Sequence, residues 1–364
     1  MAQSIRRCNK SNGGKGVNSA LYTIKYLVMI KAILVAGVFI SGVVAVTVKQ
    51  QAEKNVHDSF LPVSGDAALQ QQKDVILTIT IARADTSVNL SKLIKRGAVL
   101  QKISDQFSFT EGPAVDKKGN IFFTDQPNDK IWKYDTEGKL SVFMDKSGRS
   151  NGLYFDEKGN LIACADEKNE LWSISPEKKV TVLLDGFDGL RFNGPNDLWI
   201  DKKGGIYFTD PYYQRDYWER KKPDMEAQNL YYLAKGAKEA IIADSDFVRP
   251  NGIIGSPDGE WLYVADIGAD KTYKYKINED GSLINRQLFV QQGSDGMTLD
   301  SKGNLYITGK GVTVYDPSGT KIGNIPVPSD WVGNVCFGGK DRKTLFITAS
   351  ASVYTLQMQV RGMK

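Results

Sequence analysis

Downstream of residue 100, one position of a repeated sequence pattern is polar in every copy. The residues at this position are Glu111, Asn151, Asn196, Asn251, Asp295 and Asn334. They offer carboxylate and amide oxygens, and there is neither a histidine nor a cysteine among them. Hard divalent cations prefer such oxygen ligands, and two carboxylates nearly neutralise a divalent charge. Calcium is therefore the first candidate, with magnesium, manganese or zinc as alternatives, although zinc usually takes histidine or cysteine ligands.

A simpler explanation is that asparagine, aspartate and glycine merely mark the turns that precede strands. Turn chemistry accounts for the glycine that follows most of these residues, as in Asp295-Gly296. It does not account for a polar residue at the same position in all six copies, with a glutamate, Glu111, among them. The pattern therefore favours six side chains that meet in space.

The repeat that carries these residues is a predicted β-hairpin with a glycine in its turn. Its copies are DKKGNIFFTD from Asp116, DEKGNLIACAD from Asp156, DKKGGIYFTD from Asp201, SPDGEWLYVAD from Ser256, DSKGNLYITG from Asp300 and the degenerate GGKDRKTLFITAS from Gly338. Two more strand-like runs follow most copies, and the copies start roughly 40 to 55 residues apart. Four strands per repeat at this spacing are typical of a β-propeller blade.

Six copies predict an all-β fold, a six-bladed β-propeller over residues 96–364, with residues 49–95 as a linker. The last copy has only three strands of its own, and AVLQKIS, Ala98–Ser104, supplies a fourth from upstream. We expect this N-terminal strand to close the ring of blades, because closure removes the exposed edges of an open array. The first strand of each blade lines the central channel, so the six polar residues should form a ring at one end of it.

Composition and charge exclude several classes of function. The chain has 364 residues and a net charge of +5, but residues 1–60 carry eight basic and two acidic residues, which leaves −1 for the rest. No nucleic-acid-binding surface is therefore expected. The sole histidine, His57, lies upstream of the repeats, so the propeller cannot contain a Ser-His-Asp triad. Cys164 and Cys336 fall in apolar, strand-like runs and are expected to be small buried side chains.

The N-terminal segment, residues 1–48, has the pattern of an export signal. Basic residues are followed by an uncharged, mostly apolar stretch at 32–48, AILVAGVFISGVVAVTV. This pattern predicts either a cleaved signal peptide of a periplasmic or secreted protein, or an uncleaved anchor that tethers the protein to a membrane. The stretch MIKAILVAGVF begins like a complete signal peptide, so Met29 is an alternative start of translation.

Four stretches resemble motifs of the gluconolactonase and senescence-marker (regucalcin) family. They are FSFTEGPAVDKKGNIFFTD, RFNGPNDLWIDKKGGIYFTDPYY, RPNGIIGSPDGEWLYVAD and SDGMTLDSKGNLYITG. The resemblance runs from about Ala98 to the C-terminus, and the motifs occur in the order of the family. It implies a six-bladed propeller, one divalent metal in the channel and hydrolysis of a sugar-type lactone to the hydroxy acid.

The resemblance also implies roles for single residues. The family's metal ligands fall on Glu111, Asn251 and Asp295, and its general base falls on Asp295. Asn196 matches a position that is a metal ligand in some members and a substrate contact in others. The arginine that contacts the substrate is matched by Arg191. The histidine pair of the paraoxonases, which share the architecture more distantly, has no counterpart here.

A long loop is expected at the end of the channel where the polar ring lies. It follows the second strand of the third blade and spans Pro211–Gln228, PYYQRDYWERKKPDMEAQ. Its aromatic and cationic residues, Tyr213 and Trp218 among them, predict a partial lid over a polyol or sugar-acid substrate. The alternative is a solvated surface insertion. The ring residues Asn151 and Asn334 are expected to contact the substrate beneath the lid.

These residues predict a hydrolytic mechanism. The metal polarises the ester carbonyl, and Asp295 deprotonates the attacking water. A carboxylate that fully ligates the metal cannot act freely as a base, so a hydroxide supplied by the metal is the competing nucleophile. Arg149 and Arg191, expected at the same end of the channel, suit a carboxylate-bearing or hydroxyl-rich product. A phosphotriesterase-like hydrolase on the same metal site and a non-catalytic propeller with a structural ion are the alternative functions.

Overall fold

The computed structural model describes residues 90–363. The predicted export segment at 1–48, the alternative start at Met29, His57 and most of the predicted linker lie outside the described residues. Within the described part, no helix is long and apolar enough to cross a membrane.

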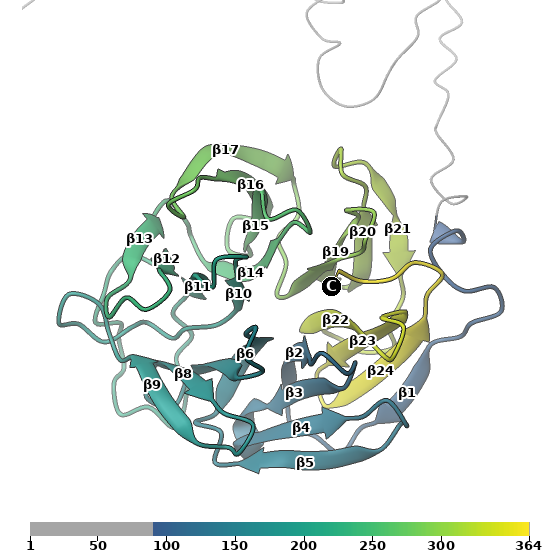
Figure 1. Ribbon diagram of the computed structural model, residues 1–364, viewed down its shortest axis with the longest axis horizontal. Coiled ribbons are helices and arrows are strands. Elements are labelled where there is room, and N and C mark those ends of the chain that lie inside the picture. Colours follow the sequence, from purple (N-terminus) through teal and green to yellow (C-terminus); the bar gives the residue numbers. More distant parts are fainter. Residues whose placement is uncertain (1–89, 364) are drawn as a thin grey trace, which may run out of the picture. The chain divides into compact units, whose positions relative to one another are not determined.

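The described chain forms six four-stranded antiparallel sheets, which surround a central axis like the blades of a propeller (Figure 1). The first sheet contains β2 (Thr110–Val115), β3 (Ile121–Asp125), β4 (Lys130–Tyr134) and β5 (Leu140–Asp145), with a short 3-10 helix, η1 (Gln126–Asn128), after β3. The second contains β6 (Ser150–Phe155), β7 (Leu161–Ala165), β8 (Glu170–Ile174) and β9 (Val180–Leu184). The third contains β10 (Leu198–Ile200), β11 (Ile206–Asp210), β12 (Asn229–Leu233) and β13 (Ile241–Asp244).

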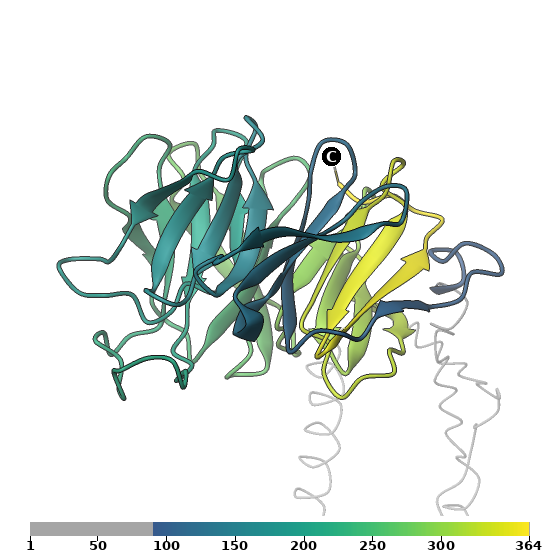
Figure 2. The same ribbon diagram turned by 90° about the horizontal axis from the view of Figure 1, so that it is seen from below.

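The remaining three blades repeat this order. The fourth sheet contains β14 (Pro250–Gly255), β15 (Trp261–Asp266), β16 (Lys271–Ile277) and β17 (Leu283–Val290). The fifth contains β18 (Met297–Leu299), β19 (Leu305–Gly309), β20 (Gly311–Tyr315) and β21 (Lys321–Ile325). The sixth contains β22 (Asn334–Gly338), β23 (Thr344–Ala349), β24 (Ser352–Gln357) and β1 (Gln101–Ser104). The prediction of an all-β, six-bladed propeller is therefore confirmed, and Figure 2 shows the blades from the side.

The sixth sheet joins the two ends of the propeller chain. Its outermost strand, β1, pairs antiparallel with β24, with Gln101 opposite Thr355. The chain just upstream also packs onto the propeller: Leu93 is buried in an apolar cluster of the last two blades, and its carbonyl accepts the N–H of Gln359 at 2.7 Å. Residues just upstream of 96 thus contribute to the packing of the last two blades.

The repeated hairpins owe their tight turns to an aspartate and a glycine. In the first blade, Asp116 Oδ1 accepts the backbone N–H groups of Lys118 and Asn120, each at 2.9 Å. Gly119 adopts φ +93°, a conformation that glycine reaches without steric cost. These turns lie at the end of the channel opposite the polar ring, so they fix the register of the inner strands without occupying the site.

In the first and third blades, a buried threonine on the second strand fastens the inner strand of the next blade. Thr124 Oγ1 donates to the carbonyl of Asn151 at 3.0 Å, and Thr209 Oγ1 donates to the carbonyl of Asn251 at 2.8 Å. Each bond fixes the backbone that carries a ring residue of the following blade. The remaining interior is apolar, and the predicted burial of Cys164 and Cys336 is confirmed.

Candidate functional site

The inner ends of the six blades bring the predicted polar residues to one end of the channel. Four of them lie on first strands, and Asn196 and Asp295 lie just before β10 and β18. All are buried except Asp295, which is partly exposed. The sequence prediction that these positions share one level of the propeller agrees with this placement.

Irregular pairing at the ring residues turns their side chains toward the axis. The antiparallel register shifts next to Glu111 in β2, around Asn151 in β6 and around Asn251 in β14. Bulges of this kind interrupt the ladder and re-aim a side chain, and they are common beside functional sites. The third and fifth blades reach the same result differently, because their first strands begin only after Asn196 and Asp295.

The glycine after Asp295 allows two blades to approach closely. A Cβ atom on Gly296 would lie only 1.9 Å from the side-chain Cγ of Asn334 in the next blade. Any other residue at this position would displace the Asn334 amide from the ring. The Asp-Gly pair that opens the fifth blade thus serves packing between ring positions, in addition to its part in the turn.

The carboxylate of Asp295 is held by two side-chain donors. Its Oδ1 accepts the Nδ2–H of Asn251 at 2.8 Å, and its Oδ2 accepts the indole N–H of Trp331 at 2.6 Å. The second carboxylate, Glu111, lies beside it, close enough for the two groups to affect each other's ionisation. Two N–H donors stabilise the ionised form of Asp295 and fix the orientation of its carboxylate.

Two carboxylates in such a confined place resist ionising together. Burial raises the pKa of Glu111 well above its ordinary value, and the charge of Asp295 adds to the effect. Burial also raises the pKa of Asp295, against the two N–H donors, which lower it. Of the pair, Glu111 holds a proton more readily when no cation is present. A bound cation would remove this repulsion, so the pair is suited to hold one.

The amide groups of the ring leave oxygen atoms available for a cation. Asn251 donates through Nδ2 to Asp295 and, at 3.0 Å, to the hydroxyl of Tyr213, but its buried Oδ1 has no hydrogen-bond partner among residues 90–363. An unsatisfied buried acceptor beside two carboxylates fits a hard cation. Within residues 90–363, no cluster of three or more histidine, cysteine or acidic side chains could hold a metal, so the amides are needed.

The metal-free protein should lose stability as the pH rises above about 4.5, the ordinary pKa of glutamate. The folded protein keeps the proton of Glu111 to a higher pH than the unfolded chain, so it binds more protons in this range, and the free energy of unfolding falls as pH increases. One such proton is worth about 1.4 kcal/mol per pH unit. Melting curves of chelated protein between about pH 5 and pH 8 measure the slope, and Glu111→Gln should make it shallower. An equal slope in both proteins would contradict the assignment.

A third carboxylate, Asp197, belongs to the site. It is buried, and it was not among the residues predicted from the sequence. It stands directly after Asn196, where four of the other five blades have glycine. Its Oδ1 accepts the N–H of Leu198 at 2.9 Å, and its Oδ2 lies 3.4 Å from Asn334 Nδ2. Burial raises the pKa of Asp197 to about 7. An aspartate in place of a repeated glycine was the signal that sequence inspection could have used.

A cavity lies at the end of the channel opposite the polar ring. Its volume is about 270 Å³, and it is lined by the inner strands and by Lys117, Arg342 and Met363 near its edge. Its inner wall includes Asp197 and Asn334. Asp197 and Asn334 thus line this cavity and also contact each other next to the ring.

The loop Pro211–Gln228 reaches the ring through one residue, Tyr213. The Tyr213 hydroxyl contacts Asn251, and burial raises the pKa of Tyr213 to about 12, so the hydroxyl is neutral at physiological pH. Trp218 packs instead within the loop: it is buried, and its indole N–H donates to the Asp166 carbonyl at 2.8 Å. The structure thus assigns the two aromatic residues different environments.

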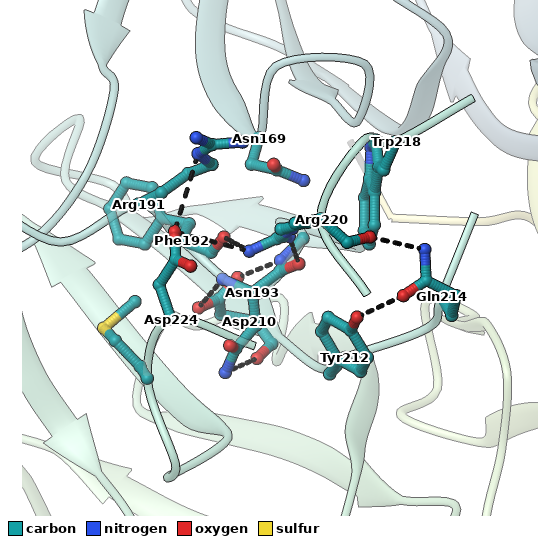
Figure 3. Close-up of polar contacts among 12 residues, drawn as sticks. Asn169, Arg191, Phe192, Asn193, Asp210, Tyr212, Gln214, Trp218, Arg220 and Asp224 are labelled. Carbon is teal, nitrogen blue, oxygen red and sulfur yellow. Dashed lines mark hydrogen bonds and ion pairs between the residues drawn. The ribbon is translucent and has the colours of Figure 1, made fainter. Parts of the chain in front are cut away.

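Most of the other loop contacts hold the loop in place, as Figure 3 shows. Arg220 donates to the backbone carbonyls of Phe192 and Asn193. Arg191, the predicted substrate contact, is exposed and pairs with Asp224 of the loop at 3.6 Å, Nε to Oδ2. The structure does not bring Arg191 to the ring, and its role toward the substrate stays a prediction.

Asp166 anchors the same loop from the second blade. In the first, third and fourth blades the equivalent aspartates, Asp125, Asp210 and Asp266, accept backbone N–H groups just upstream of their own first strands. Asp166 instead accepts Arg215 Nε at 2.9 Å and the hydroxyl of Tyr217. This departure from the repeat places the Arg215 guanidinium beside the Tyr213 ring, 5.6 Å from its centroid.

Two further ring amides, Asn151 and Asn196, have side chains without a hydrogen-bond partner in the described part of the chain, although both are buried. They are thus available to a ligand. Together with Glu111, Asn251 and Asp295 they complete a site of oxygen donors whose chemistry suits a hard cation and a hydroxyl-rich molecule.

Comparison with known proteins identifies relatives of this architecture. The family model described as SMP-30/Gluconolactonase/LRE-like region matches residues 109–351, which include all six ring positions. The chain is 28% identical to a gluconolactonase of Zymomonas mobilis subsp. mobilis over 307 residues, 76% of this chain and 86% of that protein. A 6-deoxy-6-sulfogluconolactonase of Pseudomonas putida is 35% identical over 120 residues, 30% of this chain and 41% of that protein.

A solved structure of a gluconolactonase also resembles this chain. The gluconolactonase of Xanthomonas campestris superposes with a TM-score of 0.68 and 26% identity, covering 74% of this chain and 92% of that one. The resemblance that the four sequence motifs indicated is confirmed. The chain belongs to the SMP-30/gluconolactonase/LRE-like family.

Proposed function

We propose that the protein is a divalent-metal-dependent lactonase that opens a sugar-type lactone to the hydroxy acid. The observation that carries the proposal is the pair of adjacent carboxylates, buried Glu111 and partly exposed Asp295, beside the unsatisfied Oδ1 of Asn251. The gluconolactonases among its relatives support the class of substrate. Among the ions that such oxygen donors accept, calcium suits the set best.

The ligands we assign to the ion are Glu111, Asn251 and Asp295, with Asn196 as a further ligand or a substrate contact. The two carboxylates supply the charge, and the amide oxygens complete the shell. The ion, when bound, polarises the lactone carbonyl and stabilises the negative charge that develops on its oxygen.

Asp295 is assigned the role of general base. In the reaction, a water oxygen bonds to the carbonyl carbon, the water proton moves to a carboxylate oxygen of Asp295, and the bond to the ring oxygen breaks. The same proton then passes from Asp295 to the departing ring oxygen, which becomes a hydroxyl of the product. Burial makes the carboxylate a stronger base than one in water, and the N–H groups of Trp331 and Asn251 hold its orientation.

The proposed function is tested with a panel of substrates. δ-Gluconolactone and an aliphatic lactone of the same ring size are offered to the purified protein, each with and without chelator, beside an organophosphate triester. We expect hydrolysis of the sugar lactone that chelation abolishes and a divalent ion restores. Turnover of the triester alone would instead establish a phosphotriesterase, and no turnover of any substrate would favour a non-catalytic propeller.

We also propose that residues 32–48 direct export of the protein, either as a cleaved signal peptide or as a membrane anchor. The support is the basic and then apolar pattern of the sequence. Mass spectrometry of the native N-terminus tests this proposal. The proposal would be contradicted by a mature chain that starts upstream of residue 32 and is found neither in the membrane fraction nor outside the cytoplasm.

A further inference from the structure

We infer that the natural lactone carries an anionic group away from its ester, and that Arg249 binds this group beside Tyr213. The inference rests on the proposed lactonase function and adds the chemical class of its substrate. Arg249 stands two residues before Asn251, at the ring end of β14. Sequence inspection did not single it out, because nothing in the repeat pattern marks it.

A chain of contacts places Arg249 next to the reaction site. Its guanidinium carbon lies 5.0 Å from the centroid of the Tyr213 ring, a cation–π distance. The hydroxyl of the same tyrosine lies 3.0 Å from Asn251 Nδ2, which in turn contacts Asp295 at 2.8 Å. The aromatic ring therefore separates the guanidinium from the ring of ligands. A substrate whose ester lies at Asp295 would present its far end to Arg249.

The other arginines near this end of the channel already have partners. Arg149 donates to the Pro127 carbonyl at 2.6 Å and lies 3.7 Å from Glu167. Arg191 and Arg220 hold the loop, and Arg215 is paired with the buried carboxylate of Asp166. The expectation that Arg149 and Arg191 meet the product stays a prediction, but both side chains already have partners in the described chain.

Arg249 differs from these four arginines because its guanidinium has no such partner among the described residues. It is exposed, and its side chain forms neither an ion pair nor a hydrogen bond with any residue in 90–363. Its charge is thus uncompensated by the described protein. Arg215 can assist, because it uses only Nε toward Asp166 and its two Nη groups have no partner in the described chain. Two guanidinium groups on one tyrosine ring suit an oxyanion such as a carboxylate, sulfonate or phosphate.

The test compares lactones that differ only in their far end. δ-Gluconolactone is the neutral reference, and the anionic probes are a glucarolactone with a free carboxylate, 6-phosphogluconolactone and 6-deoxy-6-sulfogluconolactone. We expect the wild type to prefer at least one anionic probe over the neutral one. Arg249→Gln should lower kcat/KM for that probe at least about tenfold, mainly through KM, since a charge-assisted contact is lost. The loss on the neutral lactone should be several times smaller.

Arg96→Gln is the matched control, since it removes another exposed arginine, at the periphery of the sixth blade. It should leave the preference for the anion unchanged. Calorimetry on the chelated protein gives a second readout that needs no catalysis: glucarate should bind more tightly than gluconate, and Arg249→Gln should abolish the difference.

The outcomes separate the two proposals. Hydrolysis of neutral and anionic lactones with equal kcat/KM, or an equal loss on both in Arg249→Gln, overturns the anion site and leaves the lactonase intact. If no lactone is hydrolysed at all, the proposed function fails. In that case tighter binding of glucarate that depends on Arg249 would still support an anion site, and its absence would reject one.

Discussion

Asp295→Asn should remain at least about a hundredfold slower than the wild type in kcat, even when it is saturated with metal. The asparagine can still offer an oxygen to the ion, so binding should persist, but it cannot accept a proton from water. It also keeps only one acceptor for the two N–H groups of Asn251 and Trp331 that the carboxylate satisfies now. Steady-state kinetics at saturating calcium and lactone measure the effect.

Glu111→Gln is the comparison that gives this result its meaning. Glu111 supplies charge to the same site but is assigned no proton to move. Once the Glu111→Gln variant is saturated with metal, it should recover most of the wild-type rate. If both variants recover equally, Asp295 only holds the ion, and the attacking water is deprotonated without it. Melting temperatures of both variants must be measured, so that a folding defect is not read as a loss of catalysis.

The second large effect concerns metal affinity. Glu111→Gln should weaken calcium binding by about tenfold or more, because a charge-assisted contact worth about 1.5–3 kcal/mol is lost. The same substitution removes the repulsion between Glu111 and Asp295, so the metal-free variant should melt at a higher temperature than the metal-free wild type.

These opposite shifts distinguish a metal ligand from a residue that only supports the fold. A supporting residue would lower both affinity and stability when replaced. Isothermal titration calorimetry with calcium and melting curves with chelator provide the two values. Glu239→Gln, an exposed carboxylate between β12 and β13, is the control and should change neither. Unchanged calcium affinity in Glu111→Gln would reject its assignment as a ligand.

Much of the fold could be predicted from the sequence because its signals are local. Asp-x-x-Gly turns specify four of the six hairpins through contacts only a few residues apart, as between Asp116 and Asn120. Six repeats of such hairpins leave few architectures other than a propeller. The ring of polar residues follows from the same repeat, because equivalent positions in equivalent blades meet around one axis.

The rest of the site depends on contacts between segments that are distant in sequence. Trp331 reaches Asp295 across a blade boundary, and Tyr213 reaches Asn251 from a long insertion. No periodic pattern marks such contacts. The loop conformation depends on Asp166, which binds Arg215 of the loop instead of the backbone N–H groups that its equivalents in other blades accept. Arg249 stands out because its guanidinium contacts Tyr213 but has no ion-pair or hydrogen-bond partner among the described residues, and that can be seen only in three dimensions.

The central claim is that one divalent ion, held by Glu111, Asn251 and Asp295, enables lactone hydrolysis. The most direct test titrates chelated protein with calcium while binding and the initial rate of δ-gluconolactone hydrolysis are measured on the same preparation. The account predicts one ion per chain and a rate that rises in proportion to occupancy, from near the uncatalysed level. A full rate in the chelated protein, or a rate that does not follow occupancy with calcium or any other divalent ion, would contradict it.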